Sequence, residues 1–258
     1  MKALLALAML TATTFAANTD TRVFEMRTYF AAPGKLDALN ARFRDHTCKL
    51  FEKHGITNIG YWMPIENPEL KLIYVLAYPD RAARDASWKA FMADPDWQAA
   101  YKASEVDGKL VAKVEQIFFT ALDFSPEIKP GISTDGRVFE MRTYTTPPGR
   151  LENLHARFRD HTVKLFAKHG MTNLFYWKLL PDQPKNANLL GTPDTTLIYL
   201  LAHQSPDAAK ASFGAFRGDP DWVAARKASE EKAGGSLTVE KDGVKSLFMK
   251  ATDYSQTK

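Results

Sequence analysis

The stretch VFEMRTY at residues 23–29 recurs unchanged at residues 138–144. The stretch RFRDHT at residues 42–47 recurs at residues 157–162, again 115 residues further along. Self-similarity at a fixed spacing is the sequence signature of a repeated structural unit. The chain is therefore predicted to consist of two tandem copies of one unit.

Later matches between the two copies are 125 residues apart, as in Leu72-Ile73-Tyr74 and Leu197-Ile198-Tyr199. Ten residues have thus been inserted into the second copy, within the stretch 182–194. That stretch is rich in Pro, Asn and Gly, which predicts a loop. We expect a first domain at residues 22–124 and a second at 137–254. The linker at 125–136 is punctuated by Pro and Gly.

Within one copy the order of elements is predicted to be β-α-β-β-α-β, the ferredoxin-like arrangement. The strands are expected at residues 22–30, 56–63, 70–78 and 110–122. Helices are expected from Leu36 to a left-handed cap at Gly55, from Asp80 onward, and again from Asp94-Pro95. The fold class is therefore α+β.

Helices on one face of such a sheet leave the other face bare, and a bare apolar face needs a partner. Two copies in one chain can supply each other. The sequence thus predicts that the two sheets pack together as one barrel with a pseudo-twofold axis. We expect a monomer, because the second copy replaces the partner subunit.

Composition is that of a globular protein, with 45% hydrophobic and 25% charged residues among 258. The net charge of +4 comes from basic residues interleaved with acidic ones, which predicts a mixed surface and no nucleic-acid partner. Cys48 is the single cysteine, so no intramolecular disulfide can form. Cys48 is expected in the core.

Residues 1–17 read as a secretory signal peptide. Lys2 is followed by the apolar run 3–10 and by Thr14-Phe15-Ala16, the small-x-small pattern that precedes cleavage. The apolar run is too short to span a bilayer. We therefore expect an exported protein, periplasmic or secreted, cleaved after Ala16 or Ala17.

The motifs together resemble the NIPSNAP family. The resemblance rests on FEMRTY at 24–29, Pro33-Gly34, FRDH at 43–46, GYW at 60–62, ASW at 86–88 and DPDW at 94–97. The second copy matches as well, with Phe175 in place of Gly60 and Phe213 in place of Trp88. The resemblance implies the dimeric α/β-barrel superfamily, whose members include cofactor-free monooxygenases and haem-degrading enzymes. It carries over no catalytic residue.

Strand alternation places Glu25, Arg27 and Tyr29 on one face of the first strand, opposite Phe24 and Met26. We expect the apolar face to meet the helices and the polar face to point into the barrel. The polar set is interpreted either as a ligand-binding pocket floor or as a structural ion-pair cluster. The predicted ligand-binding residues are Glu25, Arg27, Tyr29, Glu140, Arg142, Tyr144, Trp62 and Trp177.

His46 and His161 are the candidates for a general base, because a neutral imidazole suits proton abstraction. The alternative is a half-buried helix histidine with a structural hydrogen bond. No His-x-x-x-His spacing, no pair of cysteines and no haem-attachment motif occurs in the sequence, so no metal and no cofactor is predicted.

The sequence leaves three functions open. The favoured one is binding of a small apolar or anionic molecule in the barrel. The alternatives are a cofactor-free monooxygenase or isomerase-like enzyme, and a non-catalytic interaction protein. The presence of a cavity would distinguish the binding protein and the enzyme from the interaction protein, which needs none. A base within reach of that cavity separates an enzyme from a binding protein.

Overall fold

A computed structural model describes residues 20–132, 136–189 and 191–258 of the protein. The expected signal segment lies outside these described residues. Among the residues that are described, no helix has the length and apolar character needed to cross a membrane.

The first unit has the predicted order of elements. Its strands are β1 (Val23–Ala31), β2 (Thr57–Pro64), β3 (Lys71–Tyr78) and β4 (Val111–Ala121). Between β1 and β2 lie α1 (Leu36–Arg42), η1 (Phe43–Thr47) and α2 (Cys48–Lys53). Between β3 and β4 lie α3 (Arg81–Ala93) and α4 (Pro95–Ser104), whose N-termini are capped by the side chains of Asp80 and Asp94.

The second unit repeats this order. Its strands are β5 (Val138–Thr145), β6 (Thr172–Leu179), β7 (Thr196–His203) and β8 (Val244–Ala251). Its helices are α5 (Leu151–Arg157), η2 (Phe158–Thr162), α6 (Val163–Lys168), α7 (Pro206–Gly218) and α8 (Pro220–Lys232).

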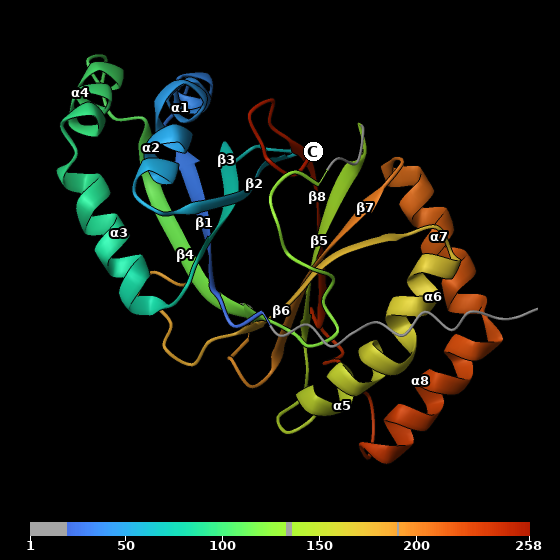
Figure 1. Ribbon diagram of the computed structural model, residues 1–258. Coiled ribbons are helices and arrows are strands. Elements are labelled where there is room, and N and C mark those ends of the chain that lie inside the picture. Colours follow the sequence, from blue (N-terminus) through green and yellow to red (C-terminus); the bar gives the residue numbers. More distant parts are fainter. Residues whose placement is uncertain (1–19, 133–135, 190) are drawn as a thin grey trace, which may run out of the picture.

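The eight strands form one closed barrel in the order β1-β3-β2-β8-β5-β7-β6-β4. Two short antiparallel ladders join the units. β2 pairs with β8, with Trp62 opposite Ala251, and β4 pairs with β6, with Phe119 opposite Leu179. Each helical layer covers the outside of its own half, α1–α4 on one side and α5–α8 on the other (Figure 1). This confirms the predicted barrel of two fused units.

The barrel interior is apolar, which overturns the predicted orientation of the first strand. Phe24 lies in the interior cluster together with Trp62, Phe139 and Trp177, and Met26 packs against it. Glu25, Arg27 and Tyr29 consequently face outward, toward the helices of their own unit. The physical reason is that both sheets contribute apolar side chains to a closed interior, where a charged pair would lose its solvation.

A π-helical turn, η1 or η2, interrupts the first helical segment of each unit. The hydroxyl of Thr47 donates to the carbonyl of Arg42, five residues back, at 3.1 Å, and Thr162 does the same to Arg157. A π-turn holds more residues than an α-turn and shifts the phase of the helix. Cys48 follows η1 and is buried as predicted, and burial raises the pKa of its thiol to about 12.

The segments that follow β4 and β8 each cross to the other unit. Asp123, after β4, forms a bidentate ion pair with Arg159, and Asp253, after β8, forms the equivalent pair with Arg44. The hydroxyl of Ser255 accepts a hydrogen bond of 2.8 Å from the backbone N–H of Tyr61 in β2. The two halves are thus tied together by exchanged ends as well as by the ladders.

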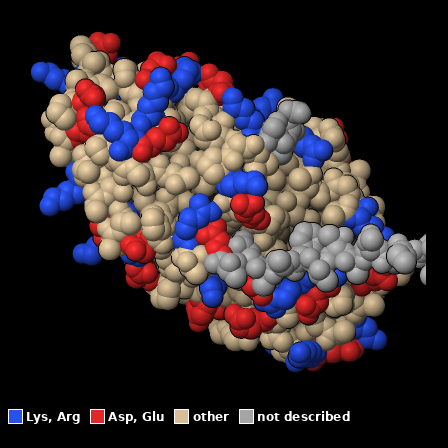
Figure 2. Space-filling view, viewed as in Figure 1, with Lys and Arg blue, Asp and Glu red and all other residues tan. Residues whose placement is uncertain are grey.

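On the face of the molecule drawn in Figure 2, charged side chains of both signs are mixed. Figure 2 shows Lys and Arg interspersed with Asp and Glu over the visible face. This face agrees with the mixed surface that the sequence predicts.

Candidate functional site

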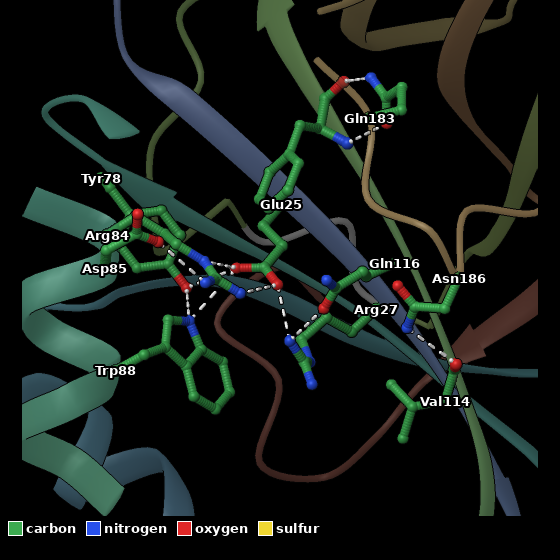
Figure 3. Close-up of polar contacts among 11 residues, drawn as sticks. Glu25, Arg27, Tyr78, Arg84, Asp85, Trp88, Val114, Gln116, Gln183 and Asn186 are labelled. Carbon is green, nitrogen blue, oxygen red and sulfur yellow. Dashed lines mark hydrogen bonds and ion pairs between the residues drawn. The ribbon is translucent and has the colours of Figure 1, made fainter. Parts of the chain in front are cut away.

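Glu25 is the centre of a polar cluster between the first sheet and α3. Its carboxylate is fully buried and accepts two hydrogen bonds from Arg84, both at 2.9 Å, and one from Arg27 Nη1 at 2.7 Å. Tyr78 and Trp88 add donors at 3.1 and 3.2 Å. Figure 3 shows these side chains converging on the carboxylate from β1, β3 and α3.

The cluster keeps Glu25 ionised. Burial alone would raise the pKa of this carboxyl, but the hydrogen bonds and charges of Arg84 and Arg27 outweigh burial and hold the pKa below its ordinary value. A carboxylate fixed in this way does not take up a proton near neutral pH. Glu25 is therefore suited to orienting the two arginines, and poorly suited to act as a general base.

A cavity of about 530 Å³ lies next to this cluster, between the sheet and the helices of the first unit. This volume falls within the usual range for small-molecule sites. Strands β1 and β4 supply one wall through Arg27, Tyr29, Val114 and Gln116. The remaining lining comes largely from the helices and includes Arg42, Phe43, Phe51, Arg84, Trp88, Phe91, Trp97 and Tyr101.

The cavity combines aromatic walls with an excess of positive charge. Arg27, Arg42, Arg84 and Lys109 line it, whereas Glu105 is the one carboxylate in the described lining. With Glu25 and with Asp85, which also pairs with Arg84, the four positive charges meet three carboxylates, so one positive charge remains in excess. A planar apolar body fits such walls, and an anionic group would meet the guanidinium ions.

Two of these arginines have unused hydrogen-bonding capacity. Arg27 Nη1 also donates to the side chain of Gln116 at 2.7 Å, and the guanidinium lies 4.4 Å from the Trp88 ring centre. Arg42 is only 4% exposed and donates from Nη1 to Ser104 at 3.2 Å. The Nε atoms of both arginines are buried and have no partner among the described residues.

The insertion at 182–194 braces the β4 wall of this cavity from the second unit. The side-chain amide of Gln183 accepts from the backbone N–H of Phe118 at 3.0 Å and donates to its carbonyl at 2.8 Å. Asn186 donates to the carbonyl of Val114 at 3.1 Å (Figure 3). The predicted loop thus acts as a strap along the part of β4 that extends beyond its ladder with β6.

The second unit has a related but altered cluster. Glu140 accepts hydrogen bonds from Arg142, from Ser246 at 2.5 Å and from the ring of His203 at 2.9 Å. Ala209 occupies the place of Arg84, so only one guanidinium reaches this carboxylate. The cavity beside it has a volume of about 270 Å³, roughly half that of the first unit.

Comparison with known proteins accounts for the repeat. The profile of the NIPSNAP family matches residues 24–126 and again residues 139–256. The chain belongs to the NIPSNAP family. No curated protein matches it.

Solved structures place this NIPSNAP chain among two-unit barrels. An uncharacterised NIPSNAP domain protein from Burkholderia xenovorans is 25% identical, over 41% of this chain and 99% of that one, with a TM-score of 0.36. A Lactobacillus acidophilus protein, provisionally assigned as a monooxygenase, is 11% identical, with coverages of 92% and 97% and a TM-score of 0.54. An anthrone oxidase-like protein is 16% identical, with coverages of 92% and 93% and a TM-score of 0.54. The last two likenesses show the fold.

The structure separates the predicted ligand-binding residues of this NIPSNAP chain into two places. Glu25, Arg27 and Tyr29, with Glu140, Arg142 and Tyr144, lie in the helix-covered layers. Trp62 and Trp177 are fully buried inside the barrel, on the opposite face of the sheet. The structure therefore does not bring all eight of these candidate residues together at one place.

The predicted bases do not reach either cavity. His46 and His161 are exposed, and neither lines the cavity of its own unit. Both lie in the π-turns, whose altered phase was not readable from an α-helical wheel. The half-buried alternative for these histidines was wrong as well.

Two important residues were missed at the sequence level. Arg84 organises the Glu25 cluster, and Arg42 lines the cavity. A signal for Arg84 existed, because Arg84 and Trp88, one helical turn apart, are both replaced in the second copy, by Ala209 and Phe213. In the part of the chain that the structure describes, His, Cys, Asp and Glu form no group of three suited to a metal ion.

Proposed function

We propose that the first unit of this NIPSNAP protein binds a small planar molecule that carries an anionic group, in the cavity between its sheet and its helices. The observation that carries the proposal is the convergence of Arg27, Arg42 and Arg84 on a space walled by aromatic rings. The proposal differs from the sequence-based expectation in location, because side chains from both sheets fill the barrel interior.

Binding is favoured over general acid–base catalysis by the state of the cavity's carboxyl groups. Glu25 is held ionised by two arginines, and Glu105 lies 3.4 Å from Arg42. Among the described residues that line the cavity there is no histidine. The geometry therefore supplies an anion-binding wall without assigning a base, whereas a base is what the alternative of an isomerase-like enzyme requires.

The test is a titration with 2-naphthoate, followed by the intrinsic tryptophan fluorescence, to which Trp88 and Trp97 in the cavity wall contribute. We expect saturable quenching, and weaker binding of the neutral 2-naphthamide. Arg42→Gln is expected to weaken the binding of naphthoate by about tenfold or more, because a charge-assisted hydrogen bond contributes about 1.5–3 kcal/mol.

Lys49→Gln is the matched control, since it removes one positive charge from an exposed position outside the cavity. An equal loss of affinity for 2-naphthoate in the two variants would show that only the net charge of the protein matters, and would contradict the proposed site. Native mass spectrometry of protein purified from its own host adds a direct search for a retained ligand.

We also propose that the protein is exported. The support is the order of Lys2, the apolar run 3–10 and Thr14-Phe15-Ala16 at the start of the chain.

A further inference from the structure

Arg157, at the end of α5, is a buried guanidinium with too few partners. The residue is 5% exposed, and its Nε and Nη1 atoms have no hydrogen-bond partner within residues 20–132, 136–189 and 191–258. Its nearest carboxylate, Glu230, is 3.6 Å from Nη1, beyond hydrogen-bond distance, and the same oxygen accepts at 3.1 Å from Arg226. Buried charges are normally paired and hydrogen-bonded.

The equivalent residue of the first unit is better satisfied. Arg42 donates from Nη1 to both Ser104 and Glu105, at 3.2 and 3.4 Å. In the second unit Arg226 stands at the position of Tyr101 and competes for the carboxylate that corresponds to Glu105. Burial outweighs the attraction of Tyr144 and Glu230 and lowers the pKa of Arg157 below its ordinary value. Arg42 thus has a carboxylate within hydrogen-bond distance, whereas Arg157 in the second copy has none in the part of the chain that the structure describes.

This guanidinium lines the 270 Å³ cavity of the second unit. The rest of that wall is largely aromatic, with Phe158, Phe166, Phe213, Phe216 and Trp222, and Arg157 lies 5.0 Å from the Trp222 ring centre. The volume lies just below the usual range for small-molecule sites, which limits the occupant to a small molecule.

The charges around this cavity favour an anion. Arg142, Arg157, Arg217 and Arg226 line it, and Glu230 is the one acidic side chain in the described lining. Arg142 is paired with Glu140, and Arg226 with Glu230. Arg157 and the exposed Arg217 at the rim therefore leave two positive charges facing a space with apolar walls.

We infer that the second unit holds its own binding site for a small aromatic or apolar carboxylate, with Arg157 as the residue that receives the carboxylate group. The planar fork of a guanidinium matches the two oxygens of a carboxylate. This site is independent of the one proposed for the first unit, because different residues form it on the other side of the barrel.

The probe is 4-fluorobenzoate, observed by fluorine NMR, with 4-fluorobenzamide as its neutral counterpart. We expect saturable binding of the carboxylate to the whole protein and much weaker binding of the amide. Arg42→Gln serves as the background variant, so that the first unit's cavity contributes little. In that background we expect binding to persist, and the addition of Arg157→Gln to weaken it by about tenfold or more.

A second pair of variants does not depend on a change in the buried core. Val244 lines the same cavity but is 41% exposed, so substitution there is compatible with folding. Val244→Glu places a carboxylate at the mouth of the cavity, where it competes for Arg157, whereas Val244→Gln adds the same bulk without charge. We expect the glutamate variant to bind 4-fluorobenzoate more weakly than the glutamine variant.

Three results would overturn the inference: equal affinity for the benzoate and the benzamide, unchanged affinity after Arg157→Gln, or equal affinity of the two Val244 variants. Complete loss of binding in Arg42→Gln alone would also overturn it, because the carboxylate would then occupy the first unit. That last result would leave the function proposed for the first unit intact.

Discussion

Glu25→Gln tests whether the buried cluster of the first unit is organised around one carboxylate. The substitution keeps the shape of the side chain and removes its charge. Arg84 and Arg27 then face a neutral amide, and one carboxylate oxygen is replaced by a group that donates. Two neighbouring guanidinium ions remain in the layer without their common anion.

The expected cost follows from the partners that remain. Breaking a buried ion pair by removing one member costs about 3–5 kcal/mol of unfolding free energy. Arg84 keeps an ion pair of 3.1 Å with Asp85, and Arg27 keeps Gln116. We therefore expect a loss near the lower end of that range, about 3 kcal/mol.

Glu140→Gln is the matched variant in the second unit. Its amide can still accept from Arg142 and Ser246 and can donate to the ring of His203. Because these hydrogen bonds can be remade, we expect a smaller loss, about 1–2 kcal/mol.

Urea unfolding of the two variants and the wild type gives the comparison, provided that the slope of the unfolding free energy against urea concentration is the same in all three. A loss for Glu25→Gln no greater than that of a surface substitution, about 0.5 kcal/mol, would refute the central role of Glu25. A larger loss for Glu140→Gln than for Glu25→Gln would refute it as well, because the difference between the clusters would then act in the opposite direction.

Four further predictions concern the whole chain. First, the pKa values of Asp94 and Asp219 are lowered, by Lys53 and His54 and by their counterparts in the second unit. Their contribution to the stability of the fold is therefore present above the ordinary pKa of 3.8 and is lost as the pH falls below it. Acid titration followed by circular dichroism should show destabilisation beginning near pH 4, and an unchanged signal there would contradict the prediction. Second, Gln183→Ala should lower stability by about 1 kcal/mol, since it removes the side-chain hydrogen bonds to the N–H and carbonyl of Phe118, of which the carbonyl still accepts from the N–H of Leu180; a wild-type urea midpoint would show that the strap is dispensable. Third, sedimentation should give the mass of a single chain, and an obligate dimer would refute the internal replacement of a partner subunit. Fourth, N-terminal sequencing of exported protein should begin after Ala16 or Ala17, and a retained Met1 would rule out cleavage.

The elements of this fold were predictable because their signals are local. Asp80 and Asp94 lie directly before apolar-periodic stretches, and both cap helices as expected. The exact repeat of residues 23–29 indicated two equal units, and the bare sheet faces then required a common barrel. Each of these steps depends on residues that are close together in the sequence or identical between the copies.

The orientation of the first strand was not predictable in the same way. Alternation shows that Glu25 and Phe24 lie on opposite faces, but not which face meets the helices. That choice depends on Arg84 and Trp88, which approach Glu25 from α3 about sixty residues later. Similarly, an α-helical wheel could not place His46, because the π-turn at residues 43–47 changes the rotation of the side chains.

The pairing of β2 with β8 has a consequence for how the protein is made. As the chain is synthesised, the first unit emerges with its apolar sheet face uncovered and with β2 lacking the neighbour that will close the barrel. That neighbour and the segment anchored by Ser255 lie almost 200 residues further along the chain, since 194 residues separate Tyr61 from Ser255, so they are translated much later. Pairing over such a long sequence separation is slow, and the half-made barrel exposes surface that can aggregate. A premature stop codon before β8 would therefore damage the half of the protein that was translated first.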